Sequence, residues 1–328
     1  MRIGMIGAGF IAKLNGEAIM ATPGVDLCAI ANRTTRNAEN LAAELGSECP
    51  IYADYQEMLE KEKPDAVLIN LAHHLHHKCF LDCAAAGTDI IIEKALANSY
   101  AECLEMIAAA KHAGIKATVF HTQRYNAIYM AATQFIEEHS LGRLLSVSDN
   151  INTHYFREGR SAWQLSQAES GGGIALNYGV HQLDRVHYFL NQKTVAFSAK
   201  YLAEKEGFEI FSSYAMMGVG DGGTPYVITG TGYSGPWVNE TRLVFEKGVL
   251  QCNLFDNGML ERGLWFGSND DPAFQRIPVP LNDEDIYKRE LRAAVDYLGG
   301  DAKEPPVPLE WAAEMVRLVE KGGEGGDL

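Results

Sequence analysis

The sequence lacks long hydrophobic runs: no apolar stretch approaches the roughly 18 residues that a membrane-spanning helix needs. Its N-terminus also lacks the pattern of a secretory signal peptide, because it opens as a short strand-like run followed by glycines. These two absences argue against a membrane-spanning protein and against a secreted one. We therefore expect a cytoplasmic protein.

Basic residues are in short supply. The 328 residues include 28 Lys and Arg against 43 Asp and Glu, a formal net charge of -15 at pH 7. A chain this acidic repels nucleic acid and anionic membrane surfaces, so we expect neither as a partner. The apolar content of 47% and charged content of 22% are ordinary for a soluble globular protein. The length suggests about two domains.

Cysteine is scarce as well. Six cysteines stand at positions 28, 49, 79, 83, 103 and 252, mostly inside apolar stretches. This spacing forms no disulfide framework. We expect reduced, buried thiols.

A glycine-rich turn follows the first apolar run of the chain. The run Ile3–Ile6 leads into Gly7-Ala8-Gly9-Phe10-Ile11-Ala12, which has the form G-x-G-x-x-A. In such a turn Gly7 permits the tight bend, Gly9 lets the backbone approach a pyrophosphate, and Ala12 lets the next helix pack closely. Tight turns also use glycine for steric reasons alone. Here the strand before the turn and the helix and strand after it favour dinucleotide binding.

Strand-like runs alternate with helical patterns between residues 1 and 121. The expected strands are Arg2–Ile6, Val25–Ala31, Ala66–Asn70, Thr88–Glu93 and Lys116–Phe120. The expected helices include Phe10–Ala21, Thr35–Leu45, His76–Ala86 and Ser99–Ala113. Such alternation indicates an α/β fold, with a doubly wound parallel sheet of the Rossmann type over residues 1–121.

The pattern changes after Phe120. The expected elements up to residue 190 are a helix over Ala127–Ser140, a strand over Leu144–Asn152 and, after three glycines, a helix over Ile174–Leu190. Strand-like segments follow at Thr194–Leu202, Phe208–Met217, Tyr226–Tyr233, Thr241–Phe245, Val249–Leu254 and Met259–Trp265. Helical patterns return at Asp285–Leu298 and Leu309–Glu320, before a glycine-rich tail, Gly322–Leu328, that we expect to fray.

These elements predict an α+β domain over residues 122–328, built on a large and mostly antiparallel sheet. We expect the open face of this sheet to be largely apolar. Such a face is rarely left in water, so we expect a second copy of the chain to cover it in a homo-oligomer.

Two positions are candidates for acid–base chemistry. Lys94 directly follows the expected strand Thr88–Glu93, and ligands of open parallel sheets bind beyond the carboxyl ends of the strands, so this amine could exchange a proton with a substrate. A solvated lysine at a strand end is the alternative. Asn177 and His181 stand four residues apart on one helix, which places them on one face. His181 could be a general base, an orienting donor or a buried structural histidine, and periodicity does not separate these roles.

Four stretches together resemble the glucose-fructose oxidoreductase and inositol dehydrogenase family (Gfo/Idh/MocA). They are Gly7–Ala12, Glu93-Lys94-Ala95, Gln123-Arg124-Tyr125-Asn126 and the run from Gly171 to Asp184. The resemblance implies that Lys94 is the catalytic lysine, which donates and accepts a proton. It also implies that His181 holds or deprotonates the substrate.

Three positions depart from the family pattern. Ala95 stands where proline is usual, which loosens the backbone after Lys94 without removing its amine. Asn177 stands where aspartate is common, so an amide that can only hydrogen-bond replaces a possible proton relay. The run His73-His74-Leu75-His76-His77 stands where the family tends to carry T-P-N-x-x-H, and only His77 matches by position.

The histidine run also suggests a metal site. However, two adjacent pairs at a turn cannot all face one ion, and no Cys, Asp or Glu is spaced to complete a ligand set. We therefore expect no metal. We expect His73 and His74 to border the nicotinamide ribose, and His74 or His77 to lie near the substrate.

The resemblance and these residues predict an NAD(P)-dependent oxidoreductase that transfers a hydride to or from a secondary alcohol of a sugar, a polyol or a related small molecule. One alternative is a non-catalytic regulator of the same fold that senses dinucleotide or sugar. Another is a redox-neutral enzyme that reduces and then reoxidises a tightly bound cofactor.

The expected cofactor is NADP or NAD. An acidic residue about 20 residues after the glycines would bind a ribose 2′-hydroxyl. This chain instead has Asn32 and Arg33 there, with Arg36 close behind, and arginine forms paired bonds with phosphate, which favours NADP. The expected cofactor-binding residues are Gly7, Gly9, Phe10, Ile11, Ala12, Asn32, Arg33, Arg36, His73, His74, His77, Glu93 and Lys94. The expected substrate-binding residues are Arg124, Tyr125, Tyr155, Trp163 and His181.

Overall fold

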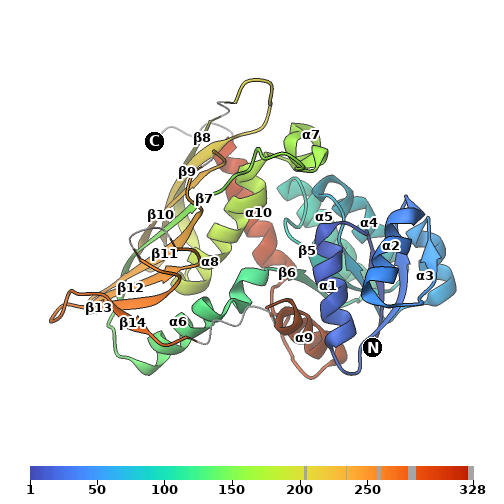
Figure 1. Cartoon of the computed structure of the whole chain (residues 1–328), viewed down its shortest axis with the longest axis horizontal. Helices are drawn as coiled ribbons and strands as arrows, with labels where there is room; N and C mark the ends of the chain where they lie inside the picture. The colour runs from blue at the N-terminus through green and yellow to red at the C-terminus, as the bar shows by residue number, and fades with distance from the viewer. Residues whose placement is uncertain (203–204, 234, 257–259, 280–285, 324–328) are drawn as a thin grey trace. The chain divides into compact units, whose positions relative to one another are not determined.

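The computed structural model describes residues 1–202, 205–233, 235–256, 260–279 and 286–323. The chain divides into two compact units (Figure 1). The first comprises Met1–Thr122 and Glu284–Val316, and the second comprises Gln123–Asp283 and Arg317–Leu328. The expectation of one C-terminal domain over residues 122–328 therefore misses a return of the chain to the first unit.

Six parallel strands form the sheet of the first unit over residues 1–122, in the order β3-β2-β1-β4-β5-β6. They are β1 (Arg2–Ile6), β2 (Asp26–Ala31), β3 (Ile51–Tyr52), β4 (Ala66–Ile69), β5 (Asp89–Glu93) and β6 (Ala117–Phe120). This order is the doubly wound one, so the predicted Rossmann-type sheet is confirmed. The sequence pattern misses only the short β3 among these strands.

The helices of this unit connect successive strands. They are α1 (Phe10–Ala21), α2 (Thr35–Leu45), α3 (Tyr55–Glu62), α4 (His73–Ala85), α5 (Tyr100–Ala113) and α9 (Ile286–Gly299), with α10 (Leu309–Gly323) running from this unit into the second. The sequence pattern does not predict α3. It also places the start of α4 at His76, whereas the helix begins at His73, so the histidine run forms its first turn.

The return of α9 to the first unit has a simple cause. Its apolar side chains stand at helical spacing: Leu291, Ala294, Val295 and Leu298. All four join the core cluster that contains Ile19 of α1 and strand residues of the parallel sheet. Because this stripe is buried there, α9 belongs to the core of the first unit.

The second unit holds a sheet of eight strands within the described residues, in the order β14-β13-β12-β11-β7-β10-β9-β8. They are β7 (Leu144–Asn152), β8 (Thr194–Leu202), β9 (Ser213–Gly220), β10 (Pro225–Thr231), β11 (Val238–Phe245), β12 (Gly248–Asn253), β13 (Gly263–Ser268) and β14 (Gln275–Ile277). Only β7 and β10 pair in parallel among these strands. The predicted, mostly antiparallel sheet is therefore confirmed.

The helical segments of this unit are η1 (Thr122–Tyr125), α6 (Ala127–Glu138), η2 (Ala162–Leu165), α7 (Gln167–Ser170), the π-helical η3 (Ala175–Gly179) and α8 (Val180–Leu190). Both α6 and α8 lie against one face of the sheet (Figure 1). β9 begins at Ser213 rather than at the expected Phe208, because the chain before it bends and Ser212 donates its N–H to the Leu202 carbonyl. Met259, the expected start of a strand, lies outside the described residues, as does the tail after Gly323.

All six cysteines are free thiols, five of them buried and Cys49 half-buried. The expectation of reduced thiols is therefore confirmed, and the expected burial holds for all but one.

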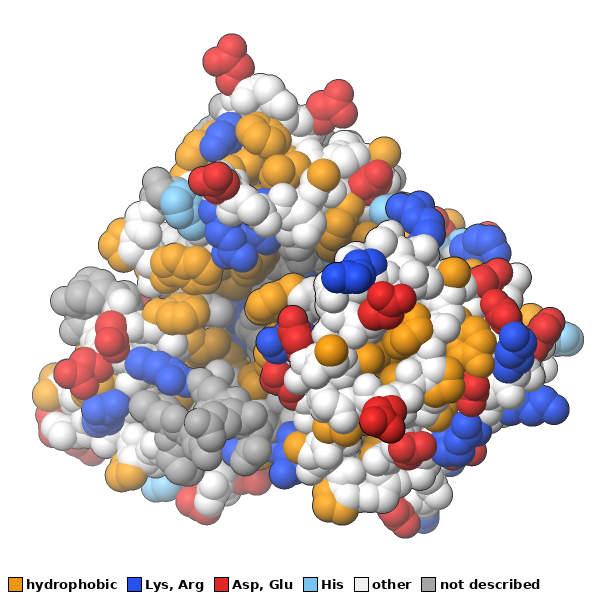
Figure 2. Space-filling view, turned by 45° about the vertical axis from the view of Figure 1, so that its right-hand side comes forward, with side chains coloured by type: hydrophobic (Ala, Val, Ile, Leu, Met, Phe, Trp, Pro, Cys, Tyr) orange, Lys and Arg blue, Asp and Glu red, His pale blue; other side chains and the backbone are white. Residues whose placement is uncertain are grey.

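Acidic and basic side chains are interspersed on the face of the molecule that Figure 2 shows. Among the described helices, none is both long and apolar enough to cross a membrane.

Candidate functional site

The glycine-rich turn between β1 and α1 leaves room for a ligand at one glycine and not at the other. Gly7 has a φ of +98°, and a Cβ there would lie 2.7 Å from the Asn70 carbonyl oxygen, so the fold itself requires glycine. Gly9 has a φ of -89°, and a Cβ built on it meets no heavy atom within 4 Å. Open space therefore borders the backbone of Gly9 at the N-terminus of α1, where free N–H groups favour anions.

The first turn of α1 separates an exposed side from a buried one. Phe10 is 84% exposed, Ile11 is half-buried, and Ala12 is fully buried against the core. The predicted close packing of α1 at Ala12 is thus confirmed, whereas cofactor contact by Phe10 and Ile11 stays a prediction.

Asn32 supports the glycine-rich turn from the end of β2. Its Oδ1 accepts the Ala8 backbone N–H at 3.2 Å, and its Nδ2 donates to the Thr34 carbonyl oxygen at 2.8 Å. Both ends of the side chain are thus engaged within the protein. Arg33 and Arg36 are exposed, and in the described parts of the chain no ion pair engages either.

A buried polar cluster joins the carboxyl ends of β4 and β5 to α1. The Nδ2 of Asn15 donates to Asn70 Oδ1 at 2.8 Å and to Glu93 Oε1 at 2.9 Å. Burial raises the pKa of Glu93, although the Asn15 hydrogen bond and the Lys94 charge oppose the rise. The carboxyl group of Glu93 therefore anchors the end of β5, a role that sequence reasoning did not assign to it.

Lys94 follows Glu93 directly and is half-buried at the carboxyl end of β5. The peptide bond between Lys94 and Ala95 is cis. The backbone N–H of Ala95 donates to Nε2 of His73 at 3.3 Å. A proline at position 95 could not make this bond, since it has no N–H.

His76 is the most deeply buried of the four clustered histidines. Its Nδ1 lies 2.8 Å from the carbonyl oxygen of Ala95, and its Nε2 lies 3.0 Å from that of Leu71. Burial lowers the pKa of His76 to about 4, with the Lys94 charge adding to the effect. Sequence reasoning gave His76 no role, because it placed the start of the helix at His76, whereas the helix begins at His73.

His77 lies toward the neighbouring helix. Its Nε2 is 2.8 Å from Oε2 of Glu105 on α5. His73 and His76 therefore contact the backbone of Ala95, whereas His77 contacts Glu105. Contact of His77 with the cofactor or the substrate stays a prediction, as does contact of the half-buried His74.

The three glycines of the second unit are required by their backbone conformation. Gly171, Gly172 and Gly173 have φ values of +67°, +141° and +61°, and a Cβ on Gly173 would lie 2.6 Å from the Cβ of Ile210. The run lets the chain turn sharply between α7 and η3. This steric need accounts for the three glycines.

Asn177 lies in the π-helical turn that leads into α8. A π-helical turn contains more residues than an α-helical turn. The spacing of four residues therefore does not by itself place Asn177 and His181 on one face of the helix. The Nδ2 of Asn177 donates to the Tyr155 hydroxyl at 3.4 Å, and that hydroxyl donates to the Gln164 carbonyl oxygen at 3.1 Å. Burial raises the pKa of Tyr155 to about 12. Tyr155 is completely buried, whereas His181 is half-buried.

Arg124 has a structural partner. Its Nε lies 3.0 Å from both carboxylate oxygens of Asp184, and its Nη2 lies 2.6 Å from Oδ1. The ion pair joins η1 to α8, and substrate contact by Arg124 stays a prediction. Tyr125 and Trp163 are half-buried in η1 and η2, and their substrate contacts stay predictions.

A buried ion pair fixes α8 to the sheet. Arg185 donates from Nε and Nη2 to the two carboxylate oxygens of Asp149, at 3.0 and 2.6 Å. Gln182 and Thr241 donate to the same carboxylate at 2.7 and 2.6 Å. Sequence reasoning missed this group, although an aspartate at an inward position of the alternating β7 was an available signal.

Arg160 is a further residue that sequence reasoning missed. Its guanidinium stacks over the Tyr155 ring at 4.3 Å, its Nε donates to the Tyr155 carbonyl at 2.7 Å, and its Nη1 donates to Gln164 Oε1 at 3.1 Å. Its Nη2 is buried and has no hydrogen-bond partner among the described residues. A donor with spare capacity thus lies one side chain away from Asn177.

Comparison with known proteins gives two matching family models. The model described as "Oxidoreductase family, NAD-binding Rossmann fold" matches residues 1–121. The model of the GFO/IDH/MocA C-terminal domain matches residues 129–251. The two models describe successive domains of one family and together cover more than half of the chain.

Individual relatives are more distant. The 1,5-anhydro-D-fructose reductase of Ensifer adhaerens is 30% identical over 211 residues, 63% of this chain and 63% of that protein. The 2,7-anhydro-N-acetylneuraminate hydratase of Escherichia coli (strain K12) is 27% identical over 156 residues, 48% of this chain and 41% of that protein. The chain thus spans less than two thirds of the length of these curated relatives. Levoglucosan dehydrogenase in complex with NADH shares the fold, with a TM-score of 0.85 at 18% identity over 99% of this chain and 97% of that one.

Proposed function

Because the chain belongs to the Gfo/Idh/MocA oxidoreductase family, we propose that it is an NAD(P)-dependent oxidoreductase acting on CH–OH groups of sugars, polyols or related small molecules. One observation carries the proposal. The same parallel sheet presents an open glycine-rich turn at Gly9 and a lysine, Lys94, at the carboxyl end of β5. A cofactor and a proton-exchanging amine at one sheet edge are the requirements of alcohol oxidation.

The residues present fit a dinucleotide. The space beside Gly9 and the free N–H groups of α1 would hold the pyrophosphate, with Phe10 and Ile11 beside it. Arg33 and Arg36 would lie at the adenosine ribose, and His73 and His74 at the nicotinamide ribose. When bound, the dinucleotide supplies the hydride acceptor or donor.

Lys94 would exchange the proton of the reacting hydroxyl. In oxidation its neutral amine takes the hydroxyl proton as the carbinol hydrogen leaves with its electron pair. In reduction its ammonium returns a proton to the substrate oxygen. His181 would hold or deprotonate the substrate, and Asn177 would contribute hydrogen bonds only, because an amide does not relay protons at neutral pH.

The substrate would meet aromatic and polar side chains of the second unit. Tyr125 and Trp163 offer half-buried rings, while the buried Tyr155 supports Asn177. The spare Nη2 of Arg160 would donate to an oxygen of the substrate, since a buried donor without a partner is costly. An oxygen-rich substrate such as a sugar meets this need.

We expect a preference for NADP. The double variant Arg33→Ala and Arg36→Ala should lose about tenfold or more in NADPH affinity, because a charge-assisted bond to phosphate contributes roughly 1.5–3 kcal/mol. Its NADH affinity should change little. Fluorescence titration of both reduced cofactors measures the effect, with Arg143→Ala, at an exposed arginine of the second unit, as the control. A clear preference of the wild type for NADH would contradict this expectation.

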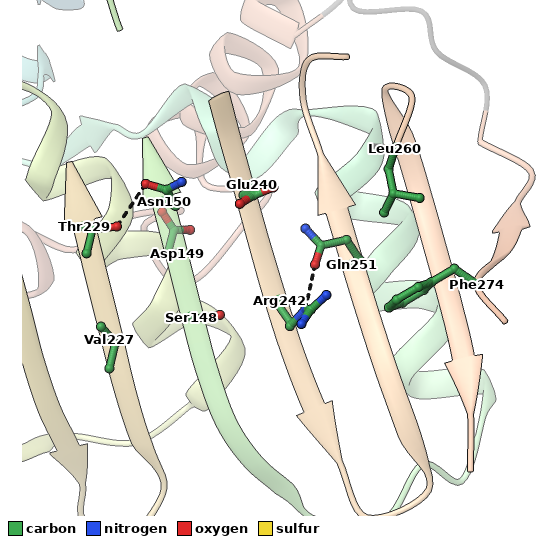
Figure 3. Close-up of a pocket in the computed structure, with 10 residues that line it drawn as sticks. All are labelled: Ser148, Asp149, Asn150, Val227, Thr229, Glu240, Arg242, Gln251, Leu260 and Phe274. Carbon is green, nitrogen blue, oxygen red and sulfur yellow. Dashed lines mark hydrogen bonds between the residues drawn. The ribbon is translucent and has the colours of Figure 1, made fainter. Parts of the chain in front are cut away.

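The open face of the second sheet is the proposed contact between copies of the chain. Figure 3 shows Ser148, Asn150, Thr229, Glu240, Arg242 and Gln251 on this face, with Val227 among them. The face is therefore mixed in polarity rather than largely apolar, which corrects the sequence-based expectation. Hydrogen bonds join Thr229 to Asn150 and Arg242 to Gln251 along it. Interfaces taken as a whole can be about as apolar as the rest of a protein surface, so a mixed face is compatible with a contact between copies.

We expect the wild type to sediment as a homo-oligomer and Val227→Arg to sediment as a smaller species, because Val227 is an apolar side chain that is 45% exposed on this face. Analytical ultracentrifugation measures the difference. Leu104→Arg is the control, since Leu104 is also exposed and apolar but lies on α5 of the first unit. A monomeric wild type at micromolar concentration would contradict the proposal.

The functional test is a substrate panel. Purified protein is incubated with sugars and polyols and with each oxidised cofactor, and nicotinamide absorbance is followed. A regulator would bind cofactor and show no turnover on any member of the panel. A redox-neutral enzyme, a possibility raised by the name hydratase of one relative, would convert its substrate without a lasting change in absorbance.

A further inference from the structure

The residue that follows Lys94 is held through both of its backbone polar groups. The N–H of Ala95 donates to Nε2 of His73 at 3.3 Å. The carbonyl oxygen of Ala95 lies 2.8 Å from Nδ1 of His76. Ala95 itself is 1% exposed, so water does not replace either contact.

His73 and His76 together support the backbone of Ala95. They stand on the first turn of α4, and their rings meet edge to face with centroids 5.8 Å apart. His73 is 3% exposed and His76 is completely buried, so neither ring is free to swing into solvent. The second nitrogen of His76, 3.0 Å from the Leu71 carbonyl oxygen, ties the same ring to the turn before α4.

The hydrogen-bond directions constrain the tautomer of His73. Because its Nε2 accepts the Ala95 N–H, a neutral His73 ring carries its proton on Nδ1. Protonation of Nε2 would remove the acceptor. In a neutral His76 ring one nitrogen carries the proton, so this ring can donate to Ala95 or to Leu71 but not to both at once.

We propose that His76 and His73 are positioning residues that fix the backbone at Ala95 and thereby aim the Lys94 amine. This inference rests on the proposed function, in which Lys94 exchanges the substrate proton. Neither histidine exchanges a proton with substrate in this account. Misplacement of a catalytic group by about 1 Å can cost about 100-fold in rate, so two backbone contacts next to Lys94 carry a measurable effect.

Two near-isosteric variants separate the contacts of His76. His76→Asn retains an N–H donor near the position of Nδ1, which faces Ala95. His76→Gln retains one near the position of Nε2, which faces Leu71. We expect His76→Asn to keep kcat within about threefold of the wild type and His76→Gln to lose about 10- to 100-fold. KM and cofactor Kd should stay close to wild type in both.

His76→Leu and His73→Leu remove the contacts altogether and should lower kcat by about 10- to 100-fold. The matched control is His112→Leu, because His112 is an exposed histidine in the last turn of α5 of the same unit. It should leave kcat unchanged. Thermal melts and cofactor titration accompany every variant, and if His76→Leu does not fold, the Asn and Gln pair decides the question.

A double-mutant cycle with Lys94 tests whether the histidines act through the lysine. If they do, His76→Gln should lower kcat in the wild-type background and have no further effect in the Lys94→Ala background. Equal kcat in His76→Asn and His76→Gln, or losses that multiply with that of Lys94→Ala, would overturn the inference and leave the proposed function intact. Full activity in Lys94→Ala would instead overturn the proposed role of the lysine, and this inference with it.

Discussion

Replacing Lys94 by alanine is expected to lower turnover by about 10²- to 10⁴-fold, the range typical of a lost general acid or base. Cofactor affinity should change little, because the glycine-rich turn and the proposed adenosine-ribose contacts at Arg33 and Arg36 do not involve Lys94. Steady-state kinetics on the true substrate, together with cofactor titration, measures both quantities. The loss should appear in kcat, since the amine acts in the chemical step.

The variant Lys94→Arg separates the charge of the side chain from its ability to exchange a proton. Arginine keeps the positive charge but does not release its proton at neutral pH, so turnover should be nearly as low as in Lys94→Ala. Lys13→Ala is the control, because Lys13 is an exposed lysine on α1 paired with Glu44. Near-normal activity in Lys94→Ala with cofactor bound would show that Lys94 is a solvated strand end. The regulator alternative would then gain weight if the panel yielded no substrate.

Gly9→Val is expected to abolish dinucleotide binding and to leave the fold intact. A Cβ at position 9 enters the open space beside the turn and meets no heavy atom within 4 Å. It would therefore displace the ligand and not the protein. Losing two charge-assisted hydrogen bonds, each worth roughly 1.5–3 kcal/mol, would lower affinity by about 10²- to 10⁴-fold.

Gly7→Ala is the matched comparison for Gly9→Val. A Cβ at Gly7 would lie 2.7 Å from the Asn70 carbonyl oxygen, in a backbone conformation with φ of +98°. Gly7→Ala should therefore lower the melting temperature, whereas Gly9→Val should not. Calorimetry and cofactor titration on both variants separate the two effects. Unchanged cofactor affinity in Gly9→Val would remove the assignment of this turn to the pyrophosphate.

The parallel sheet could be predicted because its signals are local. Continuous apolar runs, regular helical periodicity and a glycine-rich turn each lie within a dozen residues, and β1 and α1 begin and end where the pattern placed them. The return of α9 could not be predicted in this way. Its stripe of Leu291, Ala294, Val295 and Leu298 predicts an amphipathic helix, but no local pattern says which of two cores receives it.

In the candidate site, too, some residues could be predicted from local sequence and others could not. Gly7, Gly9 and Lys94 follow from strand ends and turns, which sequence spacing locates well. The partners of His73, His76 and Arg124 depend on contacts between segments far apart in the chain, such as that between Arg124 and Asp184. Polar side chains can satisfy a buried neighbour or face a ligand, and the sequence pattern is the same in both cases. For this reason the sequence did not reveal the ion pair of Arg124 or the backbone contacts of His76.

The central claim is hydride transfer between a substrate carbinol carbon and the cofactor, and isotope transfer tests it most directly. A substrate found in the panel is deuterated at the reacting carbon and incubated with the wild-type protein and oxidised cofactor. Mass spectrometry and NMR then locate the label. The account predicts one deuterium on the nicotinamide ring of the reduced cofactor for each molecule of carbonyl product. Product formation with no deuterium passing to the cofactor would contradict it.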